Sequence, residues 1–504
     1  MIKKILVANR GEIAVRVMRS SREMGIKTVA VYSEADRTSR HVSYADEACL
    51  IGPAPSNESY LLIDNIIEAA KITGADAIHP GYGFLSENVD LADRCDKEGI
   101  VFIGPRAESI RAMGDKITAR QRMIKAGVPI VPGTKEKLTS EKKALDVANK
   151  IGYPIMVKAS AGGGGKGMRL VKSKNELWEA VCTARSEALS SFGDDTVYLE
   201  KYIESPHHIE FQVLGDKFGN VIHLCERECS IQRRHQKLVE ETPSPLMTEK
   251  LRKEMGKVAV KAAKSVKYIG AGTIEFLVDD DHHFFFLEMN TRLQVEHPVT
   301  EQVLGVDLVK EQIKIADGNK LTLKQKDVVQ RGHSIECRIC AEDAENEFSP
   351  CPGIIKHITE PLGLGVRVDS YVYDGYEIPV YYDPMISKLI VWALDRNYAI
   401  KRIKRALYEY KIVGVKTNIG FLRRVFDSED FVKGKYNTHF IEKNYETMMK
   451  LPKVSKKMTE DVAIIAAYID YVMNLEDNQS VSMGEKRAIS KWKDFGKQKG
   501  LLRI

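Results

Sequence analysis

Residues 284–296 read Phe-Phe-Phe-Leu-Glu-Met-Asn-Thr-Arg-Leu-Gln-Val-Glu, an apolar run that continues into alternating polar residues. The first four residues have the composition of a buried strand. Burying carboxylates, amides and a guanidinium at its end costs free energy unless these groups bind something. A half-solvated edge strand is the alternative, but the pattern favours an active site. If the chain stays extended, its two-residue period places on one face Glu288, Asn290, Arg292, Gln294 and Glu296.

A second strand supplies a partner for this face. Residues 272–277 are an apolar strand that carries Glu275. If the hairpin that follows turns at residues 281–282, Glu275 lies opposite Glu288 with Cβ atoms roughly 5 Å apart. Facing carboxylates repel unless a proton or a cation lies between them. Together with the amide of Asn290 they offer the oxygen ligands that suit Mg²⁺ or Mn²⁺, so the spacing predicts a metal–nucleotide site.

The far end of the alternating face predicts an anion site. Arg292 offers a planar fork that matches a small oxyanion in a bidentate way. Glu296, two polar positions further on, is placed to remove a proton from that ligand. Arg338 adds another guanidinium from a separate strand, residues 334–339.

A glycine-rich segment lies between two predicted strands, residues 153–157 and 168–171. Residues 162–167 contain glycine at every position except Lys166, which leaves backbone N–H groups free to wrap phosphate oxygens. A Walker A loop needs glycine where this chain has Ser160 and serine or threonine where it has Gly167. A flap over a triphosphate is therefore favoured over a P-loop, with a flexible linker as the alternative.

Further polar residues follow this segment. A strand over residues 196–199 leads into residues 200–203, where exposed backbone could bind an adenine edge. His208 and Glu210 lie on the next predicted strand. The dense polar cluster Gln232–Lys237 comes after them, and on its own it is equally well explained as a solvated basic turn.

The composition is that of an ordinary globular protein. The 504 residues are 43% hydrophobic and 29% charged, with a formal net charge of +6, and their number predicts about three domains. Lysines and arginines are scattered among acids, which argues against a nucleic-acid surface. No apolar run approaches a membrane span and the N-terminus lacks the apolar core of a signal peptide, so we expect a cytoplasmic protein.

Eight cysteines are spread thinly along the chain, and we expect reduced thiols. A four-thiolate zinc site from Cys225, Cys229, Cys337 and Cys340 is an alternative. It is disfavoured because the last two lie in a strand-like run without the turn residues that a zinc knuckle needs.

The N-terminal part reads as a doubly wound α/β domain. A strand over residues 3–8, a helix over 11–24 and a strand over 27–32 form a βαβ unit. The turn at residues 9–12 lacks the G-x-G-x-x-G fingerprint, which argues against a dinucleotide domain. The glycine-rich loop at residues 80–84, after a predicted strand, is either a ligand-binding loop or an ordinary turn.

Three further blocks follow. Residues 115–330 have an α+β pattern, with helices expected at 116–126, 141–151 and 248–266. Residues 331–446 are rich in strands and end in helices near 398–410 and 418–426. Residues 447–504 contain a strong helix at 461–475 that is apolar over most of its circumference, so it is expected to pack against something.

Taken together, these residues resemble the biotin carboxylases of the ATP-grasp superfamily. The resemblance covers about residues 1–446 and includes several motifs in the family's order. The motifs are His79-Pro-Gly-Tyr-Gly-Phe-Leu-Ser-Glu-Asn88, Met113-Gly-Asp-Lys116, the glycine flap, Gln232-Arg-Arg-His-Gln-Lys237, Glu288–Pro298 and Asp383-Pro-Met-Ile-Ser-Lys388. The resemblance implies an N-terminal domain at 1–114, an ATP-grasp domain at 115–330 with a mobile lid at about 131–203, and a C-terminal biotin carboxylase domain at 331–446.

The resemblance also implies roles for single residues. ATP is held by Lys116, Lys158, Gly164, Gly165, Glu200, Lys201, Tyr202, Ile203, His208, Gln232 and His235. Two Mg²⁺ or Mn²⁺ ions are held by Glu275, Glu288 and Asn290. Bicarbonate is held by Lys237, Arg292, Gln294 and Val295. Biotin faces Tyr82 and Arg338, and the catalytic residues are Lys237, Arg292, Glu296 and Arg338.

The implied reaction has two steps. Glu296 deprotonates bicarbonate, which attacks the γ-phosphate of ATP to give carboxyphosphate and ADP, while Lys116, Lys158 and the metal ions neutralise charge on the phosphoryl group. Carboxyphosphate then releases CO₂, the phosphate takes the N1′ proton of biotin, and Arg338 stabilises the enolate. Biotin enters through the resemblance alone.

The chain departs from the family core in its 447–504 extension and in lacking a biotinyl-lysine domain, since the sequence around Met449-Lys450 matches that motif only loosely. The biotin carboxyl carrier protein and the carboxyltransferase are therefore expected as separate chains, with 447–504 helping to dock them or packing across the core. The family commonly forms dimers. Acetyl-CoA, propionyl-CoA and pyruvate remain open as final acceptors.

Two other functions are alternatives. One is another ATP-grasp ligase that activates a carboxylate as an acyl phosphate, against which the Arg292–Glu296 half-site and Arg338 argue. The other is a degenerate regulatory or scaffold protein of a carboxylase, against which the filled catalytic positions argue.

Overall fold

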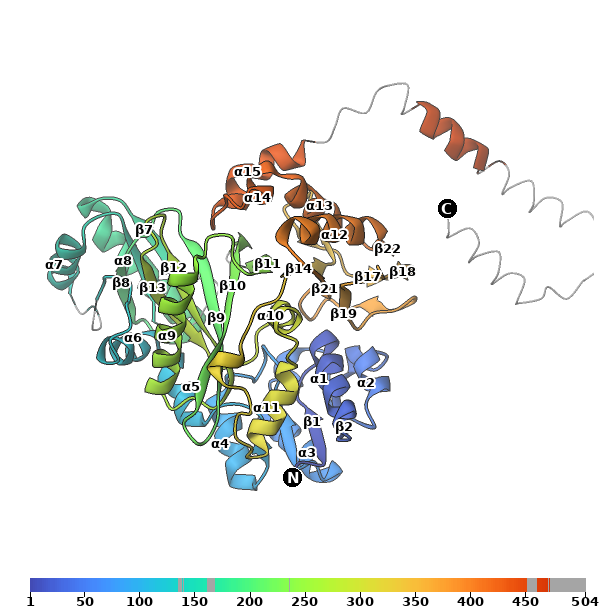
Figure 1. Ribbon diagram of the computed structural model, residues 1–504, viewed down its shortest axis with the longest axis horizontal. Helices are drawn as coiled ribbons and strands as arrows, with labels where there is room; N and C mark the ends of the chain where they lie inside the picture. The colour runs from blue at the N-terminus through green and yellow to red at the C-terminus, as the bar shows by residue number, and fades with distance from the viewer. Residues whose placement is uncertain are drawn as a thin grey trace, which may run out of the picture. The chain divides into compact units, whose positions relative to one another are not determined.

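The N-terminal part is a parallel five-stranded sheet in the order β3-β2-β1-β4-β5 (Figure 1). Helices α1 and α11 cover one face of this sheet and α3 and α4 cover the other, so the predicted doubly wound arrangement is confirmed. Helix α1 begins at Gly11, whose φ of +66° favours glycine. The bounds are β1 Lys4–Val7, α1 Gly11–Glu23, β2 Lys27–Ser33, α2 Arg40–Tyr44, β3 Glu47–Gly52, α3 Ile63–Thr73, β4 Ala77–His79, α4 Val89–Glu98 and β5 Val101–Phe102.

The structure is a computed structural model that describes residues 1–134, 138, 140–160, 168–234, 236–450, 460–469 and 471. The chain divides into two units, Met1–Met449 and Lys450–Ile504. In the second unit, residues 460–469 are helical, which agrees with the expected helix over the part that is described. No helix among the described residues has the length and apolar character needed to cross a membrane.

A small antiparallel sheet, in the order β7-β6-β8, follows helices α5 Ala107–Gly114 and α6 Lys116–Lys125. Helices α7 and α8 pack against this sheet through an apolar core that includes Val157, Val181 and Leu199. Strand β6 ends where the predicted glycine flap begins, and residues 161–167 of that flap lie outside the described residues. The bounds are α7 Glu141–Ile151, β6 Ile155–Ala159, β7 Met168–Val171, α8 Leu177–Phe192 and β8 Val197–Lys201.

The central feature is an eight-stranded sheet in the order β13-β12-β9-β10-β11-β14-β21-β19. Strand β11 pairs with β14, so the sheet runs without interruption across residue 330, where the sequence suggested a boundary. Its strands are β9 His207–Gly215, β10 Val221–Arg233, β11 Gln236–Thr242, β12 Gly270–Val278, β13 Phe284–Asn290, β14 His333–Cys340, β19 Val366–Ser370 and β21 Met385–Ala393.

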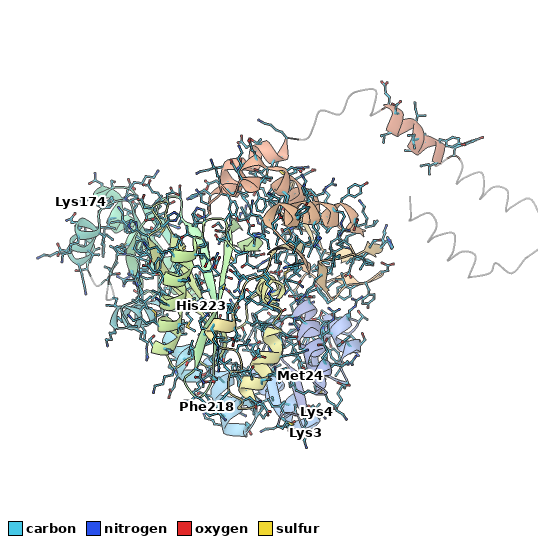
Figure 2. The ribbon with its side chains drawn as sticks, in the orientation of Figure 1. Lys3, Lys4, Met24, Lys174, Phe218 and His223 are labelled. Carbon is cyan, nitrogen blue, oxygen red and sulfur yellow. The ribbon has the colours of Figure 1, made fainter. Side chains whose placement is uncertain are left out.

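Helices cover both ends of this sheet. Helix α9, Glu249–Ser265, packs on the β9–β12 end over a core with Phe211 and Phe276. Its approach to β10 is close, because a Cβ atom at Gly256 would lie 2.4 Å from Nε2 of His223, which Figure 2 labels. Helix α12, Arg396–Glu409, covers the β14–β21 end, while α10, His297–Leu304, packs on β10, β11, β14 and β21.

The remaining helices and small sheets complete the chain up to Met449. The helices are α10 His297–Leu304, α11 Leu308–Ala316, α12 Arg396–Glu409, α13 Ile419–Asp427, α14 Glu429–Val432 and α15 Phe440–Met449. Three two-stranded sheets are built from β15 Glu342–Asp343, β16 Ser349–Pro350, β17 Gly353–Ile354, β18 His357–Thr359, β20 Glu377–Ile378 and β22 Lys411–Val413. The helices expected in the central and C-terminal blocks are confirmed to within about two residues.

The prediction of one extended strand over residues 288–296 is wrong. Strand β13 ends at Asn290, residues 291–296 form a loop, and Glu296 is the N-cap residue of α10. Pro298 at the start of that helix favours helix initiation here, since its fixed φ suits the first turn.

The pairing of Glu275 with Glu288 is confirmed, although the hairpin differs in detail. Residues 276–278 pair with 284–286 around a turn centred on Asp281, and the register then shifts by one residue so that Glu275 lies opposite Glu288. Leu287 is the extra residue at this irregularity.

The zinc alternative finds no support. Cys225 and Cys229 lie on β10, whereas Cys337 and Cys340 lie on β14, and β11 separates these two strands. Among the described residues, no group suited to a metal ion brings two of these thiols together.

Glu241 on β11 ties the sheet to the C-terminal helices. Its carboxylate accepts hydrogen bonds from Arg396 Nε and Nη2 at 2.8 and 2.9 Å and from the Tyr436 hydroxyl, and lies 2.6 Å from His333 Nε2. Burial alone would raise the pKa of Glu241, but His333 and Arg396 lower it to about 2. A group with a depressed folded-state pKa stabilises the fold above its unfolded pKa of about 4.3 and loses this contribution as pH falls toward 2.

We predict that Glu241→Gln lowers the free energy of unfolding by about 3 kcal/mol at neutral pH, because it leaves the buried charge of Arg396 uncompensated. The loss should shrink as the pH falls from about 4 toward 2, because the wild-type contribution of Glu241 is itself lost over that range. Urea unfolding at both pH values measures this. The control is Glu409→Gln, which removes an exposed helical pair with Arg405 and should change stability by less than about 0.5 kcal/mol. Equal losses in both variants would contradict the prediction.

Candidate active site

A single cavity of about 1090 Å³ collects most of the predicted site residues. It lies between the small sheet and the central sheet, and strands β6, β8, β9, β11, β12, β13 and β14 all contribute to its wall. The predicted residues that line it are Lys116, Lys158, Glu200, Lys201, Tyr202, Ile203, His208, Gln232, Lys237, Glu275, Glu288, Asn290, Arg292, Gln294, Val295, Glu296 and Arg338.

Four predicted site residues are not in that lining. Gly164, Gly165 and His235 lie outside the described residues. Tyr82 is described but does not line the cavity, and its hydroxyl instead donates to the carboxylate of Glu12.

Lys237 occupies the centre of the charged part of the cavity. Its Nζ donates to Glu210 at 2.5 Å, to Glu296 at 2.6 Å and to Glu275 at 2.9 Å. These three carboxylates come from β9, the start of α10 and β12, so Lys237 reaches from β11 past β10 to its acceptors. Burial alone would raise the pKa of Glu296, but Lys237 and Arg338 hold it well below its usual range. Glu296 is thus an ionised carboxylate at neutral pH.

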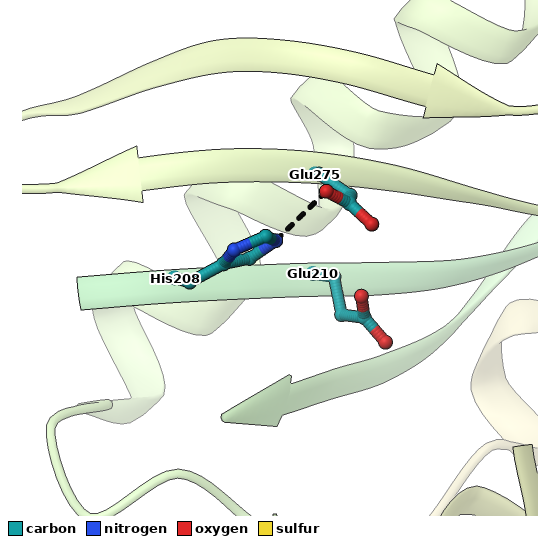
Figure 3. A group of neighbouring side chains, drawn as sticks. All are labelled: His208, Glu210 and Glu275. Carbon is teal, nitrogen blue, oxygen red and sulfur yellow. Dashed lines mark ion pairs between the residues drawn. The ribbon is translucent and has the colours of Figure 1, made fainter. Parts of the chain in front are cut away.

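Glu275 and Glu288 form the oxygen-rich corner. Oε2 of Glu275 lies 2.8 Å from His208 Nε2, as the dashed line in Figure 3 shows. Oε1 accepts from the side-chain amides of Asn290 at 2.8 Å and Gln294 at 2.7 Å. Burial and then the charge of Glu275 raise the pKa of Glu288. A divalent cation would relieve this repulsion. The side-chain oxygen atoms of Glu275, Glu288 and Asn290 are the kind of ligand that Mg²⁺ or Mn²⁺ prefers.

A second cluster of charges lies at the small-sheet end. Lys158 on β6 lies 2.7 Å from Glu200 on β8, and Arg120 also binds Glu200. Lys116 begins helix α6, and burial lowers its pKa while the charge of Glu288 opposes this. The positive charges of Lys116 and Lys158, which line the same cavity as Glu275 and Glu288, can attract a polyphosphate.

Two of the guanidiniums that line the cavity, those of Arg292 and Arg338, are each held by carboxylates. Arg292 donates from Nε to Glu87 at 2.9 Å and from Nη2 to the Asn290 side-chain oxygen at 3.0 Å. Arg338 donates from Nε to Glu240 at 2.8 Å and from Nη2 to Glu296 at 2.9 Å. Although residues 291–296 are a loop, it still turns Arg292, Gln294 and Glu296 into the cavity.

Sequence reasoning missed several residues that organise this site. Arg227 on β10 is fully buried and donates to Glu210, Gln212, Thr273, Gln294 and Thr300. Glu87 and Glu240 orient the guanidiniums of Arg292 and Arg338. Figure 3 shows His208 and Glu210 on the same strand, two residues apart. This spacing places both side chains on one face, so it could have predicted Glu210 as a site residue. Arg227 carried no local signal because its partners come from four other elements.

Comparison with known proteins places the chain in a family. Three family descriptions match it: "Biotin carboxylase, N-terminal domain" at residues 1–110, "Carbamoyl-phosphate synthase L chain, ATP binding domain" at 115–324 and "Biotin carboxylase C-terminal domain" at 336–443. A pyruvate carboxylase subunit of Methanothermobacter thermautotrophicus is 57% identical over 465 residues, which are 91% of this chain and 94% of that protein. Biotin carboxylase 1 of Bacillus subtilis is 55% identical over 449 residues, 89% of this chain and 100% of that protein.

A solved structure agrees. The biotin carboxylase domain dimer of the Hydrogenobacter thermophilus 2-oxoglutarate carboxylase, in complex with MgADP, ADP and bicarbonate, is 50% identical, with a TM-score of 0.86. The match covers 90% of this chain and 100% of that chain. The fold is an ATP-grasp fold with its flanking α/β and C-terminal parts. The chain belongs to the biotin carboxylase family.

We predict that Lys237→Met lowers the free energy of unfolding by about 3 to 5 kcal/mol near pH 8 in metal-free buffer, because three buried carboxylates lose their shared cation. Without the ammonium their pKa values rise, so folding takes up protons and the loss becomes smaller near about pH 5.5. Denaturant unfolding at both pH values measures the difference. Lys433→Met, which removes a surface pair with Glu429, is the control and should show little effect at either pH. A loss in Lys237→Met that does not depend on pH would contradict the prediction.

Proposed function

We propose that this chain carboxylates biotin on a separate carrier protein, with bicarbonate as the carbon source and ATP as the energy source. The chain is a biotin carboxylase by family, and so an ATP-dependent ligase. One observation carries the proposed roles. Within one cavity, Lys237 Nζ donates both to Glu275 and to Glu296, and Glu296 also accepts from Arg338.

Bicarbonate is proposed to bind at Lys237, Arg292, Gln294 and Val295, with Glu296 as its base. Glu296 is ionised and so can accept a proton. Its contacts with Lys237 and Arg338 also make it a weak base in the absence of ligand. When bicarbonate draws those cations to its own oxygens, the basicity of Glu296 rises, so the base becomes effective as the substrate arrives.

ATP is proposed to lie across the lysines and strand β8. Lys116, Lys158, Gly164 and Gly165 would contact phosphates, and residues 200–203 would bind the adenine edge. His208, Gln232 and His235 complete the nucleotide site. Mg²⁺ or Mn²⁺ held by Glu275, Glu288 and Asn290 would neutralise phosphate charge. Lys116 and Lys158 would stabilise the phosphoryl group as bicarbonate attacks the γ-phosphate and ADP leaves, giving carboxyphosphate.

Biotin is proposed to bind beside Arg338. Carboxyphosphate releases CO₂, the phosphate removes the N1′ proton of biotin, and the guanidinium of Arg338 stabilises the negative enolate oxygen. The carboxylated nitrogen forms when the enolate attacks CO₂. Tyr82 is not among the residues that line the cavity, and its hydroxyl donates to Glu12. Its contact with biotin therefore stays a prediction from the family resemblance.

We predict that the purified chain hydrolyses ATP in a bicarbonate-dependent way and that free biotin stimulates this activity. Glu296→Gln should lower the rate by about a hundredfold or more, since general-base catalysis contributes about 10²–10⁴-fold. A coupled ADP assay measures both. ATP hydrolysis that responds to another carboxylate but not to bicarbonate and biotin would favour the acyl-phosphate ligase. A wild-type chain that binds ATP without hydrolysing it would favour a regulatory protein.

The partners are proposed from the family and from the relatives' names. A biotin carboxyl carrier protein would present biotin, and a separate carboxyltransferase would select the final acceptor. The Methanothermobacter relative, which is named for pyruvate carboxylase, supports pyruvate among the three acceptors, and the Hydrogenobacter domain dimer supports a homodimer. Activity is proposed to occur in the cytoplasm. The carboxyltransferase that co-purifies with the chain would identify the acceptor.

We further propose that the C-terminal extension helps to dock these partners. Val462, Ile465 and Ile469 lie on one face of its described helical turns, the spacing of a helix that packs against another surface. The match to Bacillus subtilis biotin carboxylase 1 covers all of that protein but only 449 residues, or 89%, of this chain. That relative therefore has no counterpart of a segment as long as the extension.

We predict that truncation after Lys450 weakens co-purification of the carrier and carboxyltransferase by about tenfold or more and leaves bicarbonate-dependent ATP hydrolysis in place, because the cavity lining ends at Glu446. This position is preferred to residue 446 because α15 continues to Met449 and Met448 is buried in the core. Pull-down from cells and thermal unfolding measure assembly and stability. Unchanged assembly and stability would contradict the docking role.

A further inference from the structure

Strand β14 carries a polar face behind the cavity. The odd-numbered residues from 335 to 339 pack in an apolar core under α12, so Glu336 and Arg338 point to the opposite face. On that face Glu336 is the cross-strand partner of Glu240 on β11. Glu240 also accepts the 2.8 Å hydrogen bond from Nε of Arg338, whose Nη2 donates to Glu296. The guanidinium of Arg338 is therefore held by Glu296 and by one member of a pair of glutamates.

Three oxygen atoms of this pair have no partner. Oε2 of Glu240 and both oxygens of Glu336 are buried without a hydrogen-bond partner within the described part of the chain, and both side chains are 0% exposed. Leaving such buried groups unsatisfied costs free energy. Directly opposed residues on antiparallel strands have Cβ atoms about 5 Å apart, so a carboxyl O–H on one can donate to the carboxylate of the other.

The surroundings do not supply enough free positive charge to ionise both glutamates. Lys388 on β21 donates to the Val295 carbonyl at 2.9 Å and lies 3.3 Å from Glu12 and 3.9 Å from Asp369. On β19, Arg367 binds Asp369 as well. The other charged or titratable groups that act on the pair are Lys237, Arg338, Glu296, Cys229 on β10 and Cys337 on β14, while His297 and Glu301 on α10 and Arg367 on β19 belong to the neighbouring elements.

The titration of the two groups is consistent with one retained proton. Burial raises the pKa of Glu336 well above its usual value, against the lowering effect of Lys388. Burial also raises the pKa of Glu240 to about 7, against the effect of Arg338. Strongly interacting carboxyls lose their protons in steps that belong to the pair.

We propose that Glu240 and Glu336 share one proton and thereby act as positioning residues for Arg338. This inference rests on the biotin-facing role proposed for Arg338. With the pair carrying a single negative charge, Glu240 anchors the guanidinium and Arg338 keeps positive charge for the enolate of biotin. Loss of the shared proton adds a second buried negative charge behind Arg338, which weakens its stabilisation of that enolate.

The test compares the full-length wild type with Glu336→Gln and Glu240→Gln, using free biotin as the probe. The kcat/KM for biotin is measured across neutral and alkaline pH in the biotin-stimulated ATP assay. In the wild type it should fall on the alkaline side as the pair loses its proton. In Glu336→Gln the amide donates permanently to Glu240, so the fall should move upward by about one pH unit or more or disappear. Glu240→Gln should raise the KM for biotin about tenfold, because Arg338 loses its ionised acceptor and a neutral amide oxygen holds the guanidinium more weakly.

An infrared measurement tests the shared proton without activity. The difference between wild type and Glu336→Gln at neutral pH should contain the carbonyl band of a protonated carboxyl group. If Glu336→Gln does not fold, the same band is sought against Glu240→Gln. The control is Glu342→Gln, a buried glutamate with an unpartnered oxygen that lies outside the cavity lining, and it should leave the biotin pH profile in place.

The outcomes separate two kinds of failure. The shared proton would be overturned if the infrared band is missing and the kcat/KM of Glu336→Gln for biotin falls at the same alkaline pH as that of the wild type. An upward shift in Glu342→Gln equal to that in Glu336→Gln would overturn the specific link to Arg338. If the wild type shows no bicarbonate-dependent ATP hydrolysis without biotin, the proposed function itself fails, and this assay does not depend on the glutamate pair.

Discussion

The contact of one buried ammonium group with three carboxylates holds the site together. Lys237 brings Glu210, Glu275 and Glu296 to a common point, although they come from two strands and a helix start. Without that cation, three negative charges would lie together out of water, an arrangement that costs several kcal/mol. The same cation joins Glu275 to Glu296, so an anion that competes for Lys237 changes the charge balance at both carboxylates.

The uninterrupted eight-stranded sheet makes this convergence possible. Strands β12, β9, β10 and β11 carry the nucleotide side of the cavity, and β14 and β21 continue the same sheet into the C-terminal part. Arg338 on β14 therefore lies at a fixed position relative to Glu240 on β11, its direct neighbour strand. Arg338 and the cavity residues on β9, β11 and β12 are thus held by one sheet, which suits the proposed reaction, whose unstable intermediate would pass between two substrates.

Much of the site followed from local spacing. The two-residue period placed Glu288 with Asn290, and counting residues across the hairpin paired Glu275 with Glu288, even though a shift at Leu287 rather than a symmetric turn produces that register. The period failed after Asn290, because the loop and the N-terminus of α10 replace the strand. Arg292 and Glu296 nevertheless line the cavity, although the predicted extended conformation was wrong.

The sequence by itself determined the doubly wound N-terminal part, the positions of the main helices, the family and about half of the residues that line the cavity, including most of its charged ones. These depend on hydrophobic periods and on motifs a few residues long. The tertiary structure alone decided how the polar residues of the alternating segment are held. Lys237 and Arg227 meet partners on distant strands, and Glu336 meets Glu240 nearly a hundred residues away. The free energy of a buried charge depends on such partners, and local spacing does not encode them.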